Sequence, residues 1–453
     1  MQKYIIILAA CGWLIYSLLY RPKWFAIMFF AIVIAEVNFD VPGAPLNFRA
    51  LISLILFARV LLDSSEVAGP SFLSTAYSKY IIGFVVYVLL ITYSNDLLTV
   101  DVVKEYGFAL LTTYLAYYYY MKEGGYKIFK TSIIIAGFIC LGDLVWSYML
   151  GVGLAIERIY YSFTPAWEYV NHNFFGYICG IAFVFLLGDY LTQSDNNKWN
   201  LYLMPVMFFG VLLSTSRSSL LILIIVSIVL IARGLMSREN SSKAYKLVIV
   251  SISCLVIAVF MFQMLSSLFH IDSGFMEQIT SRLIDEPVAI FNRAMGNDFQ
   301  AESLDSADWR AEASQIAYDV FTKVLTTPEQ IFGIGHDGFI KGGLGFMGIY
   351  AAHNGILLML IEFGVVGFLL YYMMLISLLA KTMKSYYFSP LAICLIFIFL
   401  FMISHNREMT SLLALLITGS LAGEVQYIIG DFETEENEEN DDAAATSVAT
   451  NNF

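Results

Sequence analysis

Long apolar segments recur along almost the whole chain and decide which folds are open to it. A helix needs roughly twenty mostly apolar residues to cross the hydrocarbon core of a bilayer. A mean hydropathy of +0.72 and 14% charged residues exclude an ordinary soluble domain. The sequence therefore predicts an all-α polytopic membrane protein with about 12–14 transmembrane helices. The apolar segments lie at about 4–20, 23–37, 50–62, 79–94, 103–121, 129–150, 173–191, 200–214, 218–235, 247–269, 354–380, 387–404 and 410–428.

Basic residues in the connections predict the orientation of these spans. Lysine and arginine favour cytoplasmic loops, and here they occupy alternate connections. The long loop 271–352 then lies on the opposite, non-cytoplasmic side, together with 214–218. The connections concerned contain Arg21 and Lys23, Lys79, Lys122, Lys127 and Lys130, Lys198, Arg233, Arg238, Lys243 and Lys246, and Lys381 and Lys384.

The same pattern divides the chain into four parts. We expect an N-terminal transmembrane bundle over 1–270, a large helical loop over 271–352, C-terminal transmembrane helices over 353–429 and an acidic tail over 430–453. The first apolar segment has no small-residue cleavage signature and is interpreted as a retained span. The tail is too poor in apolar residues to offset ordering entropy, so we expect a disordered cytoplasmic end, with a docking tail as the alternative.

Inside the long loop, one stretch has the period of an amphipathic helix. Its apolar residues recur at spacings of three and four; they are Trp309, Ala313, Ile316, Ala317, Val320, Phe321 and Val324. Ser306 or Asp308 is expected to cap its start, and Pro328 to stop it. Arg310 would then sit in the first turn, where its position is fixed.

A second arginine occupies a very short connection between two spans, Ser214–Ser219. Arg217 is either an interfacial residue that reaches lipid headgroups or part of a binding site. In the second interpretation, Arg217 and Arg310 hold a diphosphate in two forked contacts that lysine cannot match. The hydroxyls of Ser216 and Ser218 and the following helix N-terminus would favour the same anion.

His353 ends the long loop and is the candidate general base. A neutral imidazole can accept a proton from a hydroxyl near neutral pH, although His353 and Asn354 could simply cap the next helix. Glu362, two turns further on, is either a site residue, because an acid inside a membrane is costly, or the cap of a helix that breaks around Gly364 and Gly367. The weaker rivals of His353 are His172, His336 and His405.

Other classes of site find little support. All five cysteines lie inside apolar segments, which indicates neither disulfides nor a metal knuckle. No cluster has metal-ligand spacing, and there is no Walker-type phosphate loop. We expect no metal, no cofactor and no nucleic-acid partner. Four more acids, Glu36, Glu105, Asp143 and Asp189, lie near segment ends and are expected to be satisfied locally.

Three short motifs, in this order, resemble the bacterial O-antigen ligase/polymerase superfamily. The first is Ser-Thr-Ser-Arg217. The second is Asp308-Trp309-Arg310 followed by an amphipathic helix, Pro328 and Gly333-Ile-Gly335. The third is His353-Asn354-Gly355 with Glu362-Phe-Gly364-Val-Val-Gly367. The resemblance covers about residues 200–380. Two departures are that Ser218 stands where the family often has glycine, and that the loop helix has no second tryptophan.

The resemblance implies a fold similar to GT-C glycosyltransferases in the bacterial inner membrane, with a metal-independent active site facing the periplasm. The donor of the implied reaction would be an undecaprenyl-diphosphate-linked oligosaccharide, and the acceptor would be a sugar hydroxyl. Arg217 and Arg310 would bind the diphosphate, with Ser216, Ser218, Asn354 and Glu362 as further substrate contacts, and His353 would act as the base. Membrane lipids, a chain-length regulator and a flippase of the same pathway are the other expected partners.

Several acceptors fit these residues equally well. A polymerase transfers the glycan to another lipid-linked repeat unit, an O-antigen ligase to lipid A-core, and a protein O-oligosaccharyltransferase to serine or threonine. The long loop and the absence of an attached soluble domain favour the polymerase. A polysaccharide flippase or other transporter is the alternative from a different class; charge gathered at one membrane face, rather than near the midplane, favours an enzyme.

Overall fold

A computed structural model gives the fold of the chain. The described residues are 12, 16, 18–37, 48–62, 71–122, 124–149, 159–160, 170–192, 198–237, 240–249, 305–341, 354–384, 389–402 and 414–427. The labelled helices among them are α2 (Pro22–Ile34), α3 (Phe48–Leu62), α4 (Ala76–Ser94), α5 (Val100–Met121), α6 (Gly125–Met149), α7 (His172–Thr192), α8 (Lys198–Leu213), α9 (Arg217–Met236), α13 (Asp305–Asp319), α14 (Thr327–Phe332), α15 (Gly338–Lys341), α16 (Gly355–Lys384) and α17 (Pro390–Met402), with a short 3₁₀ turn at Phe72–Ser74. Residues 241–249 and 414–427 are helical as well.

This architecture confirms an all-α polytopic membrane protein. Five helices of the described part are long and apolar enough to cross a bilayer: α4, α6, α7, α9 and α16. Three shorter apolar helices, α2, α8 and α17, accompany them. The one strand pair that the described residues form is short, with β1 (Ile159–Tyr160) antiparallel to β2 (Val170–Asn171).

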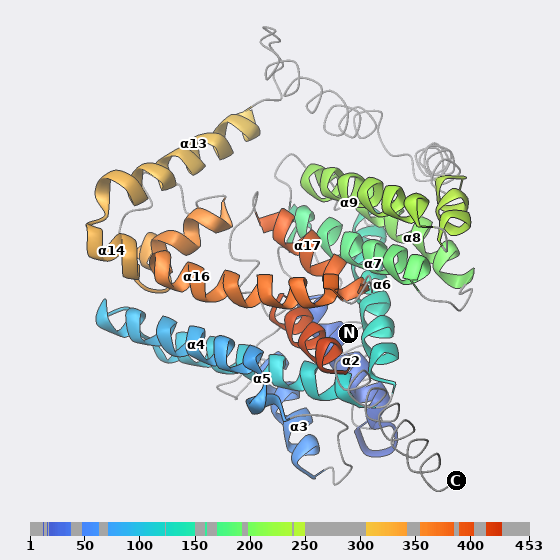
Figure 1. The fold of residues 1–453 in the computed structure, drawn as a ribbon, viewed down its shortest axis with the longest axis horizontal. Helices are drawn as coiled ribbons and strands as arrows, with labels where there is room; N and C mark the ends of the chain where they lie inside the picture. The colour runs from blue at the N-terminus through green and yellow to red at the C-terminus, as the bar shows by residue number, and fades with distance from the viewer. Residues whose placement is uncertain are drawn as a thin grey trace, which may run out of the picture.

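Helix α7 is the centre of one group of packed helices. It contacts α6, α8, α9 and α17 (Figure 1), and 89% of its membrane span is buried. Glycines on α7 allow the close approach, because a Cβ on Gly188 would lie 3.3 Å from the Cα of Pro390 in α17. Helix α9 is more peripheral, with 33% of its span buried. Apart from Arg233 in its last turn, its exposed side chains are apolar, as on a surface that faces lipid.

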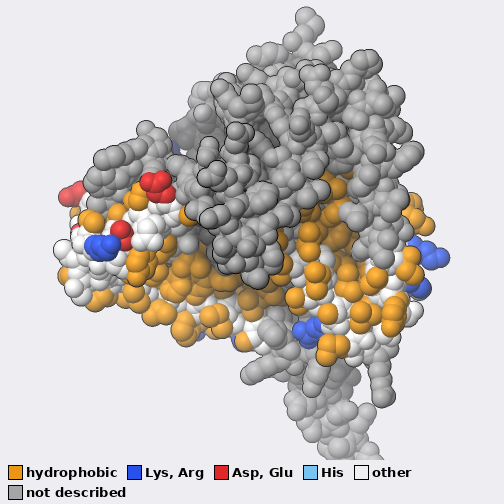
Figure 2. Space-filling model, turned by 90° about the horizontal axis from the view of Figure 1, so that it is seen from above, with side chains coloured by type: hydrophobic (Ala, Val, Ile, Leu, Met, Phe, Trp, Pro, Cys, Tyr) orange, Lys and Arg blue, Asp and Glu red, His pale blue; other side chains and the backbone are white. Residues whose placement is uncertain are grey.

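The surface agrees with a membrane environment. Figure 2 shows hydrophobic side chains across the described face, with few charged ones, mostly near the left and right margins. Large apolar side chains such as Leu221, Ile228 and Val229 on α9 are each more than half exposed. In water such a continuous apolar surface would be costly, whereas lipid tails cover it without penalty.

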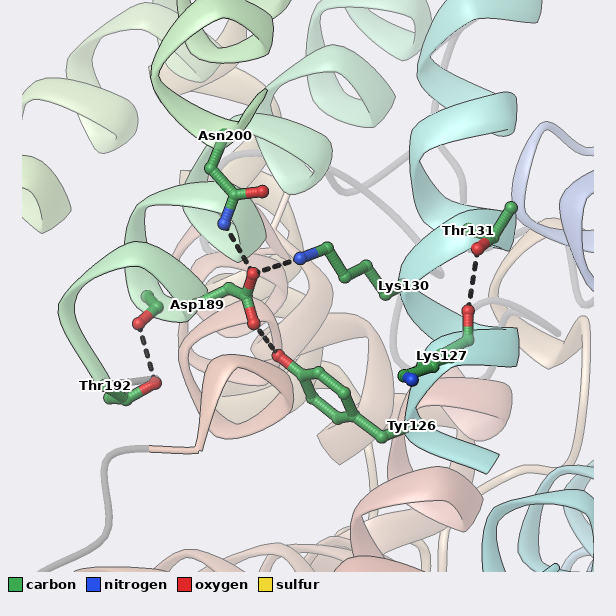
Figure 3. Close-up of polar contacts among 8 residues, drawn as sticks. Tyr126, Lys127, Lys130, Thr131, Asp189, Thr192 and Asn200 are labelled. Carbon is green, nitrogen blue, oxygen red and sulfur yellow. Dashed lines mark hydrogen bonds and ion pairs between the residues drawn. The ribbon is translucent and has the colours of Figure 1, made fainter. Parts of the chain in front are cut away.

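Asp189 of α7 is buried but has partners from two other helices (Figure 3). Lys130 of α6 donates to Asp189 at 2.5 Å, Asn200 of α8 donates at 2.5 Å, and the Tyr126 hydroxyl of α6 donates as well. A buried carboxylate is tolerated when it is paired and hydrogen-bonded. The sequence predicted that Asp189 finds its hydrogen-bond partners locally. It does have partners, but they come from the neighbouring helices α6 and α8, so Asp189 links three helices.

A second group joins α4, α5 and the described part of the long loop to α16. Helix α16 lies between α4 on one side and α13 and α14 on the other (Figure 1). A small apolar core unites α13, the following loop and the start of α16. Its buried members are Ala317, Val320, Leu325, Ile334, Phe339, Leu358 and Ile361.

The loop helix differs from its prediction at both ends. Helix α13 begins at Asp305, so Ser306 already lies within it. A π-helical turn at Val320–Val324 then replaces the last α turn. Ala313, Ala317 and Val320 are buried as predicted, but Val324 is 55% exposed, because a π turn adds a residue and rotates the end of the helix away from the apolar face.

The prediction that Pro328 stops this helix is wrong. The chain leaves helical geometry three residues earlier, at Leu325. Pro328 instead lies in the first turn of α14, where proline needs no hydrogen-bond donor. Thr326 and Glu329 form a capping box there, with the Thr326 N–H donating to Glu329 Oε2 at 2.7 Å.

Candidate functional site

The turn between α8 and α9 is a compact structure that fixes Arg217. Ser216 caps α9, accepting from the Ser219 N–H at 3.4 Å, and its hydroxyl lies 2.8 Å from the Ser219 hydroxyl. Ser214 Oγ accepts from the Ser216 N–H at 3.2 Å. Arg217 is therefore the first residue of α9, partly exposed, at the end of the helix that favours anions.

Two hydroxyls beside Arg217 have unused hydrogen-bonding capacity. The side-chain oxygens of Thr215 and Ser218 are buried and have no hydrogen-bond partner within the described part of the chain. Thr215 also has a φ of 52°, in the left-handed region that is costly for a branched residue. Unsatisfied buried groups and backbone strain are typical of binding sites. Ser216, in contrast, already uses its hydroxyl as a cap.

A glycine of α7 makes room for this turn. A Cβ on Gly176 would lie 2.8 Å from the Ser216 Cβ and closer still to Ser214 Oγ. Real Cβ atoms do not approach other atoms so closely, so any larger residue at Gly176 must displace the turn. Sequence reasoning missed Gly176, which no motif distinguishes from the other helical glycines.

Arg310 and His353, the other two predicted site residues, are not fully described by the structure. Arg310 lies in α13, within the predicted loop helix, but its side chain is not described. His353 lies outside the described residues, immediately before Asn354. Asn354 caps α16, because its Oδ1 accepts from the N–H groups of Ile356 and Leu357 at 3.1 Å each. The predicted meeting of Arg217, Arg310 and His353 stays a prediction.

Helix α16 is broken at Gly364, as the glycine motif suggested. Gly364 has φ 62° and ψ −176°, a combination open almost only to glycine. Glu362 lies just before the break and is 3% exposed. A buried carboxylate at a helix break is an unusual position, and it is the position at which the sequence predicted a site residue.

The break in α16 is matched by the Gly-Ile-Gly loop. Gly333 also has a glycine-only backbone, and a Cβ on it would lie 2.6 Å from the Gly364 nitrogen. The N–H groups of Ile334 and Gly335 donate to the carbonyls of Ile361 and Glu362, at 3.1 and 2.8 Å. The loop thus supplies the donors that the broken helix lacks.

Tyr87 of α4 completes this arrangement. Its hydroxyl lies 2.6 Å from the Phe332 carbonyl and 3.1 Å from the Phe363 carbonyl. Two family-like motifs that are far apart in the chain, Gly333-Ile-Gly335 and Glu362-Phe-Gly364, are therefore one structural unit held against α4. Sequence reasoning named both motifs but missed Tyr87, because one tyrosine among the 29 of the chain carries no signal.

His336 follows this loop and is buried against α4 and α5. Its ring lies near Tyr106 and Glu105 of α5. Burial lowers the pKa of His336, but the hydrogen bond with Glu105 and the charges of Glu362, Glu105 and Asp337 outweigh burial, so the pKa is raised. Sequence reasoning considered Glu105 to be satisfied locally; its partner lies in the long loop instead.

In the described part of the chain, no three His, Cys, Asp or Glu side chains are arranged so that they could hold a metal ion. Comparison with known families gives a match over residues 202–372 to the family described as O-antigen ligase. A comparison with curated proteins found no match. The matched stretch contains Arg217, α13, α14 and the break in α16.

Proposed function

We propose, from the O-antigen ligase domain of residues 202–372, that this multi-pass membrane protein is a surface-polysaccharide polymerase. The domain confirms the predicted resemblance to the O-antigen ligase/polymerase superfamily and supports a glycosyltransferase-like enzyme. The finer proposal is transfer of a glycan from an undecaprenyl-diphosphate-linked donor to the hydroxyl of another lipid-linked repeat unit, at the periplasmic face of the inner membrane.

The observation that carries the proposal is the turn at Arg217. Arg217 is the first residue of α9, and its neighbours in the chain, Thr215 and Ser218, have buried hydroxyl oxygens without a hydrogen-bond partner in the described residues. A helix N-terminus, an arginine in its first turn and free hydroxyl donors all favour an anion with several oxygens. A diphosphate has that chemistry.

In the proposed reaction the diphosphate is the leaving group. The acceptor hydroxyl attacks the anomeric carbon of the donor, the new glycosidic bond forms, and the bond to the diphosphate oxygen breaks. Arg217 and Arg310 stabilise the charge that develops on that oxygen. His353 takes the proton of the attacking hydroxyl. Two guanidinium groups supply the charge stabilisation, so the proposed chemistry uses no metal.

Glu362 is proposed to orient the acceptor or the base. The Gly333–Gly335 loop and Tyr87 hold the backbone carbonyls of Glu362 and Phe363, and the Glu362 side chain is buried beside the helix break. A carboxylate there can accept hydrogen bonds from sugar hydroxyls or from an imidazole. Asn354, one residue after His353, is proposed as a further contact in addition to its role as a cap.

The test is glycan profiling of a deletion strain that carries single variants. Arg217→Lys is expected to be nearly as damaging as Arg217→Ala, because lysine keeps the charge but not the forked contact. Arg233→Lys, at the other end of α9, is the matched control and is expected to give normal polymer. Polymer at the normal level from Arg217→Lys would refute the diphosphate contact.

The same profile distinguishes the acceptors. Single-repeat products on the cell surface of the deletion strain indicate a polymerase, whereas accumulated long lipid-linked chains indicate an O-antigen ligase. Loss of glycan from proteins alone indicates a protein O-oligosaccharyltransferase. A flippase would leave the lipid-linked unit on the cytoplasmic side, while an enzyme variant leaves it on the outer side, where a periplasmic probe detects it. A flippase and a chain-length regulator are the expected partners of the polymerase.

A further inference from the structure

His336 is held by contacts with two helices outside the proposed diphosphate contacts. It is 3% exposed. Its Nδ1 lies 3.2 Å from the Tyr106 hydroxyl and its Nε2 lies 3.5 Å from Glu105 Oε2, both on α5. Its backbone N–H donates to Thr92 Oγ1 on α4 at 3.0 Å. The ring therefore has one partner for each nitrogen, and one of them is a carboxylate.

The charged groups that face His336 are all acidic. Helix α5 contributes Glu105, the loop itself contributes Asp337 with Oδ2 at 3.9 Å, and α16 contributes the charge of Glu362. Helix α4 contributes only the neutral Thr92 to this contact. On α3, Arg49 interacts electrostatically with Glu105 and so acts on the partner of His336.

The position of His336 is coupled to that of Glu362. The neighbouring Gly335 donates its N–H to the Glu362 carbonyl at 2.8 Å. The His336 ring also lies parallel to the ring of Phe363, at 5° and 6.5 Å between centroids. A Cβ on Gly335 would lie 2.9 Å from the Thr92 Cα, which shows how closely the loop fits against α4. A shift of His336 therefore shifts the backbone that carries Glu362.

We propose that His336 is a positioning residue controlled by protonation, whose charged ring bridges α5 to the acidic side of α16 and so holds Glu362 in place. When the ring loses its proton, the attraction to Glu105, Asp337 and Glu362 is lost, and the Gly333–Gly335 loop separates from the helix break. The proposal rests on the proposed function in one respect only, that Glu362 serves the reaction.

The direction of the pH dependence comes from the raised pKa of His336. A group whose pKa is higher in the folded state stabilises that state when protonated. This contribution is complete below the ordinary histidine pKa of about 6.5 and is lost as the pH rises through the raised value. Docking of the loop, and turnover with it, should therefore weaken on the alkaline side.

Hydrogen exchange of the full-length protein in nanodiscs tests the docking directly. After correction for intrinsic exchange, protection of the amides of Ile334, Gly335 and His336 is expected to fall several-fold from pH 6 to about pH 8.5. His336→Gln should abolish that dependence, and Glu105→Gln should move the loss to lower pH. Unchanged pH dependence in both variants would overturn the proposal.

Glycan transfer measured over the same pH range tests the coupling to the reaction. The turnover number of the wild type should fall over the range in which protection falls, and the His336→Gln profile should lack that step. Asp319→Asn is the matched control, because this exposed acid pairs with Lys323 on the surface of the loop helices. A pH-dependent docking without any matching step in turnover would refute positioning. Absence of transfer at every pH, with docking still controlled by His336, would refute the proposed function alone.

Discussion

Gly364→Ala is the most informative single change to the break in α16. At φ 62° and ψ −176° an alanine is strained by about 1–3 kcal/mol. Its Cβ would also lie 2.5 Å from the Gly333 nitrogen, and closer to the Ile331 carbonyl oxygen. The backbones of α16 and of the Gly333–Gly335 loop cannot move apart without opening the contact between them. We therefore expect α16 to straighten and the loop to detach from it.

The cost can be worked from the contacts that detachment removes. Three donors join the loop, Tyr87 and the break. The N–H groups of Ile334 and Gly335 donate to the carbonyls of Ile361 and Glu362, and the single Tyr87 hydroxyl proton is shared between the carbonyls of Phe332 and Phe363. At a net value of about 1 kcal/mol per donor, these contacts contribute roughly 3 kcal/mol to docking. A strain of about 3 kcal/mol offsets this contribution and lowers the docking equilibrium about a hundredfold.

The assay is hydrogen exchange at Ile334 and Gly335, together with glycan transfer. Protection at these amides should fall about a hundredfold, and transfer should fall with it. Gly83→Ala on α4 is the control, since its Cβ would meet no atom within 4 Å and alanine favours a helix by up to about 1 kcal/mol. Normal protection and normal transfer in Gly364→Ala would show that the break does not depend on this glycine.

Three further changes test other parts of the structure. Gly176→Ala should displace the turn that holds Arg217 and reduce glycan transfer at least tenfold, which corresponds to a free-energy cost of about 1.4 kcal/mol. The control is Gly142→Ala, which has open space around its Cβ and should not change transfer. Asp189→Asn leaves Lys130 without its buried carboxylate and should cost up to about 3 kcal/mol, measured as a lower midpoint of thermal unfolding in detergent; an unchanged midpoint would contradict the role of the pair. His353→Gln should keep the thermal midpoint and lose transfer, and full activity would remove His353 from the role of base.

Hydropathy predicted the helical segments well because burial in lipid depends on composition alone. The predicted segments at 79–94, 173–191 and 218–235 became α4, α7 and α9 with end shifts of a few residues. The short segment at 50–62 became α3, which extends back to Phe48. Such agreement needs no knowledge of which helix packs against which.

Local patterns failed where the chain leaves ideal helical geometry. The exposure of Val324 results from a π turn, which no spacing of apolar residues announces. Pro328 was expected to end a helix and instead starts one, since proline suits a first turn as well as it ends a last one. The helix had already ended at Leu325, which is buried in the small apolar core of the loop.

Long-range contacts were beyond the sequence for a different reason. The motifs around Gly333 and Gly364 were both noted, but their mutual fit depends on two backbones that pack too closely to admit a side chain between them. The partnership of Glu105 with His336 joins a span near the start of the chain to the long loop. A single sequence states the residue types at both places but not that they meet.

The groups proposed for the reaction are divided between two helix groups, which meet where α16 contacts α17 and where α5 contacts α6. Arg217 belongs to the group of helices around α7. Glu362 lies in α16, which is joined to α4 where the Tyr87 hydroxyl contacts the carbonyl of the next residue, Phe363. The distance between leaving group and acceptor therefore depends on how these two helix groups pack against each other within the bilayer. Lipids of different thickness should change the turnover number of this protein while leaving each helix group folded.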